Sequence, residues 1–352
     1  MRILITGVGG PTPRSFAIAL KQYSFYRRFE LIATDINKYA VGLYQPHLFS
    51  KSYIVPRAGA ADYWPAMEKI IADHQIDIAV ILPELEVIEW SRRQQTGSLP
   101  CKALIPDLSM AELLVDKARM TDILAADDIV PASVSFSRNE ENLNTVFEQL
   151  GEQFWVRSTK GTSGLGSLLI SGMQQLKNWI HINPGVDDFI ASTYLPGRNL
   201  ACKMLYHQGK LMRTACGERV NYIMAKVAPS GITGNTSFGR LLNEPALVDT
   251  ALKAMDRLFE HTGAARHGFF TADFKEDAHG KPYITEVNVR HVAFTQCFAA
   301  GGANFAADTI RLLDGDPDFD RNYRMYEFEK GLIFLRDVDA LPILMRESEL
   351  LG

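Results

Sequence analysis

Several features are scarce or absent in this sequence, and each absence narrows the class of protein. The 352 residues include four cysteines, which lie far apart and form no C-x-x-C spacing. This argues against a disulfide scaffold or a structural zinc site and fits a reducing compartment. No apolar run is long enough to cross a membrane, and residues 1–7 lead into a short strand instead of a signal peptide. We therefore expect a cytoplasmic protein.

A strong excess of charge is lacking as well. The chain has 37 Lys and Arg against 41 Asp and Glu, which gives a net charge of −4. Such a balance provides no electrostatic basis for binding nucleic acid or an anionic membrane, and neither partner is expected. Internal repeats and low-complexity segments are absent too. A hydrophobic content of 47% over this length is enough for two or three globular domains.

The first third of the chain predicts a doubly wound α/β domain. The expected elements are strands at residues 2–6, 29–34, 78–82 and 102–105, with helices at 14–22, 61–74 and 108–115. This alternation is typical of a parallel sheet, here ending near residue 115. A glycine loop follows the first strand, and Asp35 follows the second, as in dinucleotide-binding domains. However, Pro11 and Pro13 interrupt the fingerprint, which favours a tight turn without a cofactor over NAD binding.

The most informative stretch is residues 268–304. Residues 269–274 alternate small or polar with apolar side chains, a charged turn follows, and residues 283–287 form a second strand. A hairpin of these strands places Asp273 opposite Glu286 and Asn288, and such hard oxygen donors suit Mg²⁺. Arg290 falls on the same face, where it would face an anion held by the metal. The alternative is a solvated hairpin edge with ordinary surface charge.

A second informative stretch joins a cationic strand to a loop rich in glycine, serine and threonine. The strand carries Arg157, and the loop contains Lys160, Ser163 and glycines at 161, 164 and 166. Glycines let backbone N–H groups approach phosphate oxygens closely. The loop lacks the G-x-x-x-x-G-K-[ST] pattern of a Walker loop, and a flexible hairpin turn is the alternative. Lys117, at the start of a helix expected at 116–126, either reaches a phosphate or forms a surface ion pair.

The remaining segments suggest where a substrate would bind. Residues 216–239 are predicted to form a long polar loop, which in a compact chain serves as a lid or substrate loop, or is disordered. Helices are expected at 247–262 and 305–313, and a last strand at 331–335. The candidate substrate contacts, each with a plain surface role as its alternative, are Arg213, Arg219, Lys226, the loop 230–236, and Glu84 or Glu86 after the strand at 78–82.

Together these motifs resemble the ATP-grasp superfamily, most closely the large chain of carbamoyl-phosphate synthase and the carboxylate–amine ligases. The matching pieces, in chain order, are Asp116-Lys117, Val156-Arg157 with its glycine loop, Tyr194-Leu195-Pro196-Gly197, the step from Asp273 to Glu286, and Glu286-x-Asn288-x-Arg290. The resemblance implies an N-terminal pre-ATP-grasp domain at 1–115, a small lobe at 116–195 and a large lobe at 196–352. It covers essentially the whole chain.

The resemblance also implies roles for individual residues. ATP would contact Lys117, Arg157, Lys160, Gly161, Ser163, Gly164, Gly166, Ser192, Thr193, Tyr194, Leu195 and Asn199. Asp273, Glu286 and Asn288 would hold Mg²⁺, and Arg290 with Arg157 would act in catalysis. The chain departs from the family pattern at Ser192 or Thr193 and at Asn199, where a glutamate is usual.

The implied activity is an ATP-dependent carboxylate–amine ligase that forms an acyl-phosphate and releases ADP and phosphate. Its partners would be a small carboxylate and an amine, and family members are often homodimers. Alternatives are activation of bicarbonate, a nucleotide-binding regulatory protein without turnover, and an NAD-dependent oxidoreductase based on the first glycine loop.

Overall fold

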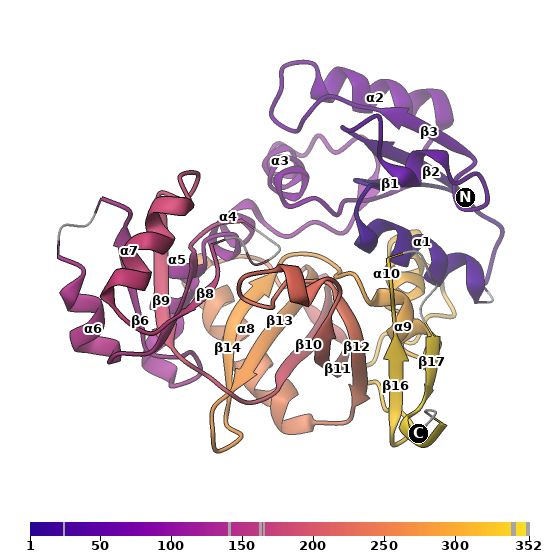
Figure 1. Ribbon diagram of the computed structural model, residues 1–352. Helices are drawn as coiled ribbons and strands as arrows, with labels where there is room; N and C mark the ends of the chain where they lie inside the picture. The colour runs from indigo at the N-terminus through magenta and orange to yellow at the C-terminus, as the bar shows by residue number, and fades with distance from the viewer. Residues whose placement is uncertain (24, 140–141, 162–163, 165, 339–342, 350–352) are drawn as a thin grey trace.

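The computed structural model describes residues 1–352 apart from 24, 140–141, 162–163, 165, 339–342 and 350–352. Three sheets organise this part of the chain (Figure 1). A parallel sheet comes first, a small antiparallel sheet follows, and a large, mainly antiparallel sheet completes the fold. Of the helices in the described ranges, none has both the length and the apolar character to span a bilayer.

The N-terminal sheet is parallel, with strand order β3-β2-β1-β4-β5. Its elements are β1 Arg2–Thr6, α1 Pro11–Gln22, β2 Glu30–Asp35, β3 Lys51–Ile54, α2 Tyr63–His74, β4 Ile78–Val80, α3 Glu84–Gln95 and β5 Lys102–Ala103. Alternate residues of β1 face opposite sides, so Ile3 and Ile5 pack with α1 while Leu4 packs with α2 and α3. Helices therefore cover both faces, and the predicted doubly wound domain is confirmed.

The small sheet has the order β6-β9-β7-β8 and is antiparallel. It consists of β6 Ser133–Ser137, β7 Phe154–Ser158, β8 Leu168–Ile170 and β9 Asp188–Thr193, with α6 Asn144–Leu150 and α7 Met173–Ile182. Phe136, Phe154 and Phe189 centre a hydrophobic core that belongs to this sheet and its two helices. The small sheet is thus a compact unit with its own core.

The large sheet follows the order β14-β13-β10-β11-β12-β16-β17, with β15 paired to β11. Its strands are β10 Asn199–His207, β11 Lys210–Tyr222, β12 Thr236–Leu242, β13 Gly268–Glu276, β14 Pro282–Asn288, β15 Arg324–Met325, β16 Leu332–Leu335 and β17 Ile343–Arg346. The prediction of a loop across residues 216–239 is therefore wrong at its two ends, because residues 216–222 belong to β11 and residues 236–239 to β12. Charged residues at these ends form ion pairs across the sheet, for example Glu218 with Arg240 on β12.

Helices join the large sheet to the N-terminal domain. They are α4 Leu108–Leu114, α5 Lys117–Leu124, α8 Pro245–Thr262, α9 Thr295–Ala300 and α10 Phe305–Asp314. One core contains residues of β1, β2 and α4 together with α8 and β13, and a second joins α1 to α9 and α10 (Figure 1). Because helices pack across the expected borders, the division at residues 115 and 195 stays a prediction.

Candidate active site

Two cavities meet at the β13–β14 hairpin. The first, of about 300 Å³, lies between the small sheet and the large sheet. The second, of about 990 Å³, lies between the N-terminal domain and the large sheet. Both are lined by Lys117, Gly161, Arg219, Asp273 and Glu286. The hairpin is therefore the place where ligands of the two cavities would touch.

The hairpin brings the three predicted metal ligands together. Asp273 on β13 pairs in register with Glu286 on β14, and Thr271 pairs with Asn288. The Asn288 Nδ2 atom lies 3.2 Å from Asp273 Oδ2 and 3.4 Å from Glu286 Oε1. Side chains two residues apart on a strand share a face, so the two carboxylates and the Asn288 amide converge on one point, where the amide nitrogen donates to both carboxylates.

The electrostatics of this pair fit a divalent cation. Burial and the neighbouring Glu286 carboxylate raise the pKa of Asp273 to about 7, although its ion pair with Arg219 works in the opposite direction. Burial also tends to raise the pKa of Glu286, but the cations of Lys117 and Arg157 outweigh it and lower that pKa. A Mg²⁺ ion would remove the conflict between these two adjacent, partly buried carboxylates.

Two carboxylates and one amide would suit Mg²⁺ better than a transition metal, which favours His and Cys ligands. In the part of the chain that the structure describes, no three His, Cys, Asp or Glu side chains form a metal-holding cluster. The protein would thus supply two carboxylates and one amide oxygen, and leave the other positions to phosphate and water. Mg²⁺ is commonly bound in this way.

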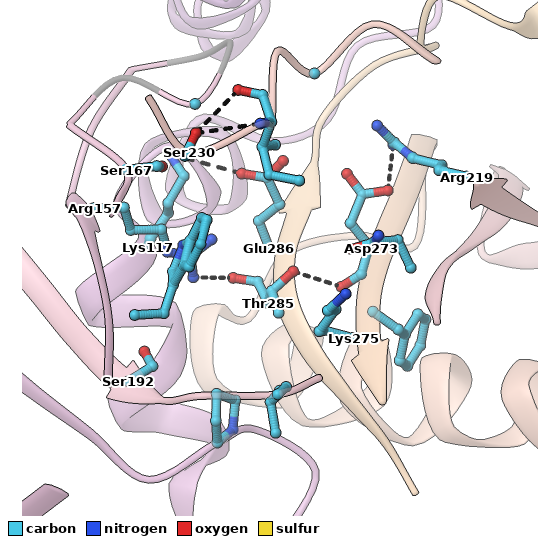
Figure 2. A pocket seen from close by; sticks show the side chains of 18 of the residues that line it. Lys117, Arg157, Ser167, Ser192, Arg219, Ser230, Asp273, Lys275, Thr285 and Glu286 are labelled. Atoms are coloured by element: carbon cyan, nitrogen blue, oxygen red, sulfur yellow. Dashed lines mark hydrogen bonds and ion pairs between the residues drawn. The ribbon is translucent and has the colours of Figure 1, made fainter. Parts of the chain in front are cut away.

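Two cations face the hairpin from the side of the small sheet (Figure 2). Lys117 lies in the first turn of α5, whose N-cap Asp116 accepts a hydrogen bond from the backbone N–H of Arg119. The Lys117 Nζ atom donates to Gly161 O at 2.7 Å and lies 3.8 Å from Glu286 Oε2. Arg157 on β7 donates to Thr285 O, whereas its buried Nε has no partner among the described residues. Burial lowers the pKa of both cations, so each would gain from an anionic ligand.

The described residues of the glycine-rich loop lie beside the two cavities. Gly161 lines both cavities, Gly164 lines the first and Lys160 lines the second, where its Nζ lies 3.7 Å from Asp116. Gly164 has φ +74°, and a Cβ there would meet Ile232 O at 2.6 Å. Gly166 lines neither cavity, and its carbonyl accepts a hydrogen bond from the Trp179 indole. Ser163 falls outside the described residues.

The predicted hinge residues border the other end of the first cavity. Ser192, Thr193, Tyr194, Leu195 and Asn199 all line it. The Ser192 hydroxyl is tied to the Ser133 hydroxyl at 2.8 Å, which joins β9 to β6 at this wall. The connection between the two sheets therefore forms one side of the cavity, as the hinge interpretation requires.

Some residues of the first cavity were not anticipated. Trp155 lies two positions before Arg157, and Lys275 lies two positions after Asp273, so each shares a face with a predicted residue. Strand periodicity could have identified both. Tyr222, at the end of β11, had no such signal because its strand was interpreted as a loop.

The second cavity contains the predicted catalytic arginine and two acidic side chains. Arg290 Nη2 lies 3.0 Å from Glu84 Oε1 in the first turn of α3. Glu86 is 4% exposed and accepts a hydrogen bond from the Tyr63 hydroxyl at 3.0 Å. Burial raises the pKa of Glu86 to about 7. Arg219 also borders this cavity, so it and Glu86 lie where a substrate could contact them.

Two predicted substrate contacts need correction. Arg213 is buried on β11, where it donates to the backbone oxygens of Met212 and Asn322, each at 2.7 Å, and lies 4.6 Å from the Phe319 ring. It lines neither cavity and holds the chain around residue 320. Lys226 is exposed on a short 3-10 turn and lines neither cavity. Neither residue is carried forward as a substrate contact.

The glycine loop after β1 is filled by groups of the N-terminal domain itself. The Gly9 N–H donates to Asp35 Oδ2 at 2.7 Å, and a Cβ on Gly42 would meet Val8 O at 2.2 Å. The acid at the ribose-binding position thus occupies the loop itself, as the tight-turn interpretation expects. This argues against the NAD-dependent alternative.

Comparison of the fold with solved structures defines its class. N5-carboxyaminoimidazole synthetase from Staphylococcus aureus, complexed with ADP, matches with a TM-score of 0.68 and 14% identity, over 95% of this chain and 81% of that one. L-amino acid ligase from Bacillus licheniformis matches with a TM-score of 0.65 and 14% identity, over 95% and 78%. Biotin carboxylase from Campylobacter jejuni, in an ATP complex, matches with a TM-score of 0.69 and 14% identity, over 95% and 75%.

These structures are ATP-grasp enzymes, and the chain has the ATP-grasp fold behind a parallel-sheet N-terminal domain. At 14% identity, the likeness defines the fold and leaves the reaction to be argued from the site. No protein-family model matches the chain, and no curated protein matches its sequence.

Proposed function

We propose that this protein is an ATP-dependent ligase that activates a carboxylate as an acyl-phosphate and joins it to an amine, releasing ADP and phosphate. The observation that carries the proposal is the Asp273–Glu286–Asn288 cluster at the junction of two cavities, with Lys117 and Arg157 facing it. ATP would occupy the cavity beside the small sheet, and the acid and amine would occupy the other.

The first step is phosphoryl transfer, in which positioning and charge stabilisation supply most of the catalysis. Lys117 and Arg157 would offset negative charge on the phosphates from the side of the small sheet. Mg²⁺, when bound by Asp273, Glu286 and Asn288, would offset charge on the β- and γ-phosphates. Gly161 and Gly164 would let the loop backbone approach the phosphates closely.

The second step is attack of the amine on the activated carboxyl group. Arg290 would stabilise the acyl-phosphate from the second cavity, where its guanidinium now pairs with Glu84. Glu84 would attract the ammonium form of the amine, and Glu86 in its ionised form, with a pKa of about 7, would accept its proton. The neutral amine would then form the C–N bond as the C–O bond to phosphate breaks and phosphate leaves. Arg219, which pairs with Asp273, would help to hold the acid.

The solved structures support the proposal through the ligands and activities that they contain. An ADP complex and an ATP complex occur among them, and one neighbour is an L-amino acid ligase. One biotin carboxylase neighbour contains MgADP and bicarbonate, so bicarbonate activation is the second candidate. A cavity of about 990 Å³ is far larger than bicarbonate needs, which favours larger substrates.

The proposal is tested by measuring ADP release from ATP and Mg²⁺ in a matrix of small carboxylates and amines, with mass detection of products. A pair-dependent signal and a product lighter than its substrates by one water are expected. Glu286→Gln should reduce turnover by about 100-fold or more, whereas Glu148→Gln, exposed on α6, should not. ATP binding with no ADP release from any pair would contradict the ligase and favour a non-catalytic nucleotide-binding protein.

A further inference from the structure

One wall of the second cavity is apolar although it borders charged groups. Ile36 follows β2, Ala58 lies between β3 and α2, and Leu85 with Ile88 belongs to α3. Leu85 and Ile88 are three residues apart and so share a helix face. Ile36 and Leu85 remain 54% and 52% exposed. Ala58 and Ile88 are partly buried against the core, so Ile36 and Leu85 form the exposed part of this wall. Single exposed apolar residues are ordinary, but two from separate segments that border one cavity favour a binding surface.

This wall begins beside the reacting end of the cavity. Glu84 directly precedes Leu85, and it lies four residues before Ile88 on the same side of the helix. Its carboxylate is 3.0 Å from the Arg290 guanidinium, which in turn lies two residues beyond Asn288. A ligand whose nitrogen lies at Glu84 and Glu86 would therefore place its substituent against Leu85.

We propose that the amine substrate carries an apolar substituent of several carbons, which Leu85, Ile36 and Ile88 bind and select. This inference rests on the proposed function and names the class of its second substrate. Ammonia, or an amine as small as methylamine, would leave the wall exposed and most of the cavity unfilled.

The position of the wall assigns it to the amine and not to the acid. The carboxyl group that is activated must lie beside Asp273, Glu286 and Arg290, where the two cavities join. The apolar wall belongs to the N-terminal domain, and Glu84 and Glu86 stand next to it. The Glu84 carboxylate would attract an ammonium group on this side of the cavity.

Binding of amines to the protein without ATP tests the inference directly. Saturation-transfer NMR would give Kd values for phenethylamine, n-butylamine and methylamine. Phenethylamine should bind at least about 10-fold more tightly than methylamine, since each carbon in an apolar pocket contributes several-fold. Leu85→Ser and Ile36→Ser should each remove most of this preference, and Leu85→Met should restore it.

A matched control is Ile54→Ser. Ile54 is 59% exposed at the end of β3 and lines neither cavity, so its replacement should leave all three affinities unchanged. Equal affinities for the three amines, or an equal loss in Ile54→Ser, would overturn the inference.

The ADP-release matrix separates this inference from the ligase proposal. The ligase proposal and this inference are both supported if ADP release is fastest with apolar amines and if Leu85→Ser loses this preference while its KM for ATP is unchanged. Release that is fastest with ammonia or methylamine overturns the inference and leaves the ligase standing. Absence of release from every pair, with the apolar preference in binding intact, overturns the ligase and leaves the cavity's selectivity standing.

Discussion

Glu86 and Lys203 are buried ionisable side chains that have no ion-pair partner within the described ranges. Glu86 hydrogen-bonds to Tyr63, and Lys203 is 4.8 Å from the ring centres of both Phe294 and Phe298, with Thr295 Oγ1 at 3.3 Å. Each is more easily held in its neutral form. Their effects on stability therefore have opposite dependence on pH.

For Glu86, stability should fall as the pH rises. Burial raises its pKa from 4.5 to about 7, so between these values the unfolded chain releases the proton and the folded chain keeps it. Glu86→Gln should remove this loss and raise stability at pH 8 by up to about 3 kcal/mol. Thermal unfolding at pH 5 to 8 measures it, with Glu84→Gln as the control. A difference from wild type that is constant with pH would contradict the assignment.

For Lys203, stability should rise as the pH rises. Burial lowers its pKa from 10.5 to about 7, so above pH 7 the folded protein holds a neutral amine while the unfolded chain still binds the proton. Lys203→Met should stabilise the protein by about 2–4 kcal/mol at pH 6, since cation–π contacts offset part of the cost, and by little near pH 10. Chemical denaturation at both pH values checks this, with exposed Lys253→Met as the reference. An equal or negative effect at pH 6 would refute it.

The residues that sequence reasoning placed well are those on short, regular strands. Asp273, Glu286 and Asn288 were found because a two-residue period and a hairpin turn together define which side chains meet. Arg213 was misplaced because two of its three backbone partners are oxygens near residue 320, more than a hundred positions away. No local pattern encodes such a contact.

At the scale of elements, the glycine-rich loop depends on its fit against the segment around Ile232. Gly164→Ala adds a Cβ that would meet Ile232 O at 2.6 Å, so the loop should shift away from the phosphate-binding position. We expect KM for ATP to rise by about 10-fold with little change in the unfolding temperature.

The control for this change is Gly151→Ala. Gly151 also has a positive φ, of +80°, but nothing lies within 4 Å of an added Cβ. It therefore reports backbone strain without a clash. A similar rise in KM in both variants would show that the contact with Ile232 does not position the loop.

The prediction of elements failed where charged residues are buried in a strand instead of exposed in a loop. Glu218 and Arg219 suggest a polar loop, yet on β11 they are 8% and 7% exposed because Arg240 and Asp273 neutralise them. Conversely, α5 was predicted well because its N-cap, Asp116, is a local signal. Elements absent from the expectations include β3, α3, β6, α6, α7 and α9.

At the scale of the whole molecule, the C-terminal part of the chain returns to the N-terminal domain. Gln296 N donates to Ser15 Oγ at 2.8 Å, and Asn304 Nδ2 donates to Ala19 O at 3.0 Å. Ala306 and Ile310 of α10 complete the core beneath α1. The N-terminal domain and the large sheet are thus packed as one body.

A fragment of residues 1–115 should therefore not fold cooperatively, although the sequence suggests an independent domain. It would lose α8, α9 and α10, which cover both of its helical faces. Circular dichroism and urea titration of the fragment test this, with the full chain as the control. A sharp two-state transition in the fragment would contradict this expectation.

The predicted homodimer is tested by analytical ultracentrifugation of the full chain.

The small sheet stands apart from this body, since it has its own core and joins the rest near Pro131 and Pro196. A rearrangement that admits or releases a nucleotide can therefore be a movement of the small sheet alone, while the N-terminal domain and the large sheet keep their relative positions. A fluorophore pair spanning the small and large sheets would report each binding event. A fluorophore pair on α1 and α10 would show no change in transfer efficiency, because these helices share one core. The same protein thus provides one pair that reports nucleotide binding and one pair that serves as its control.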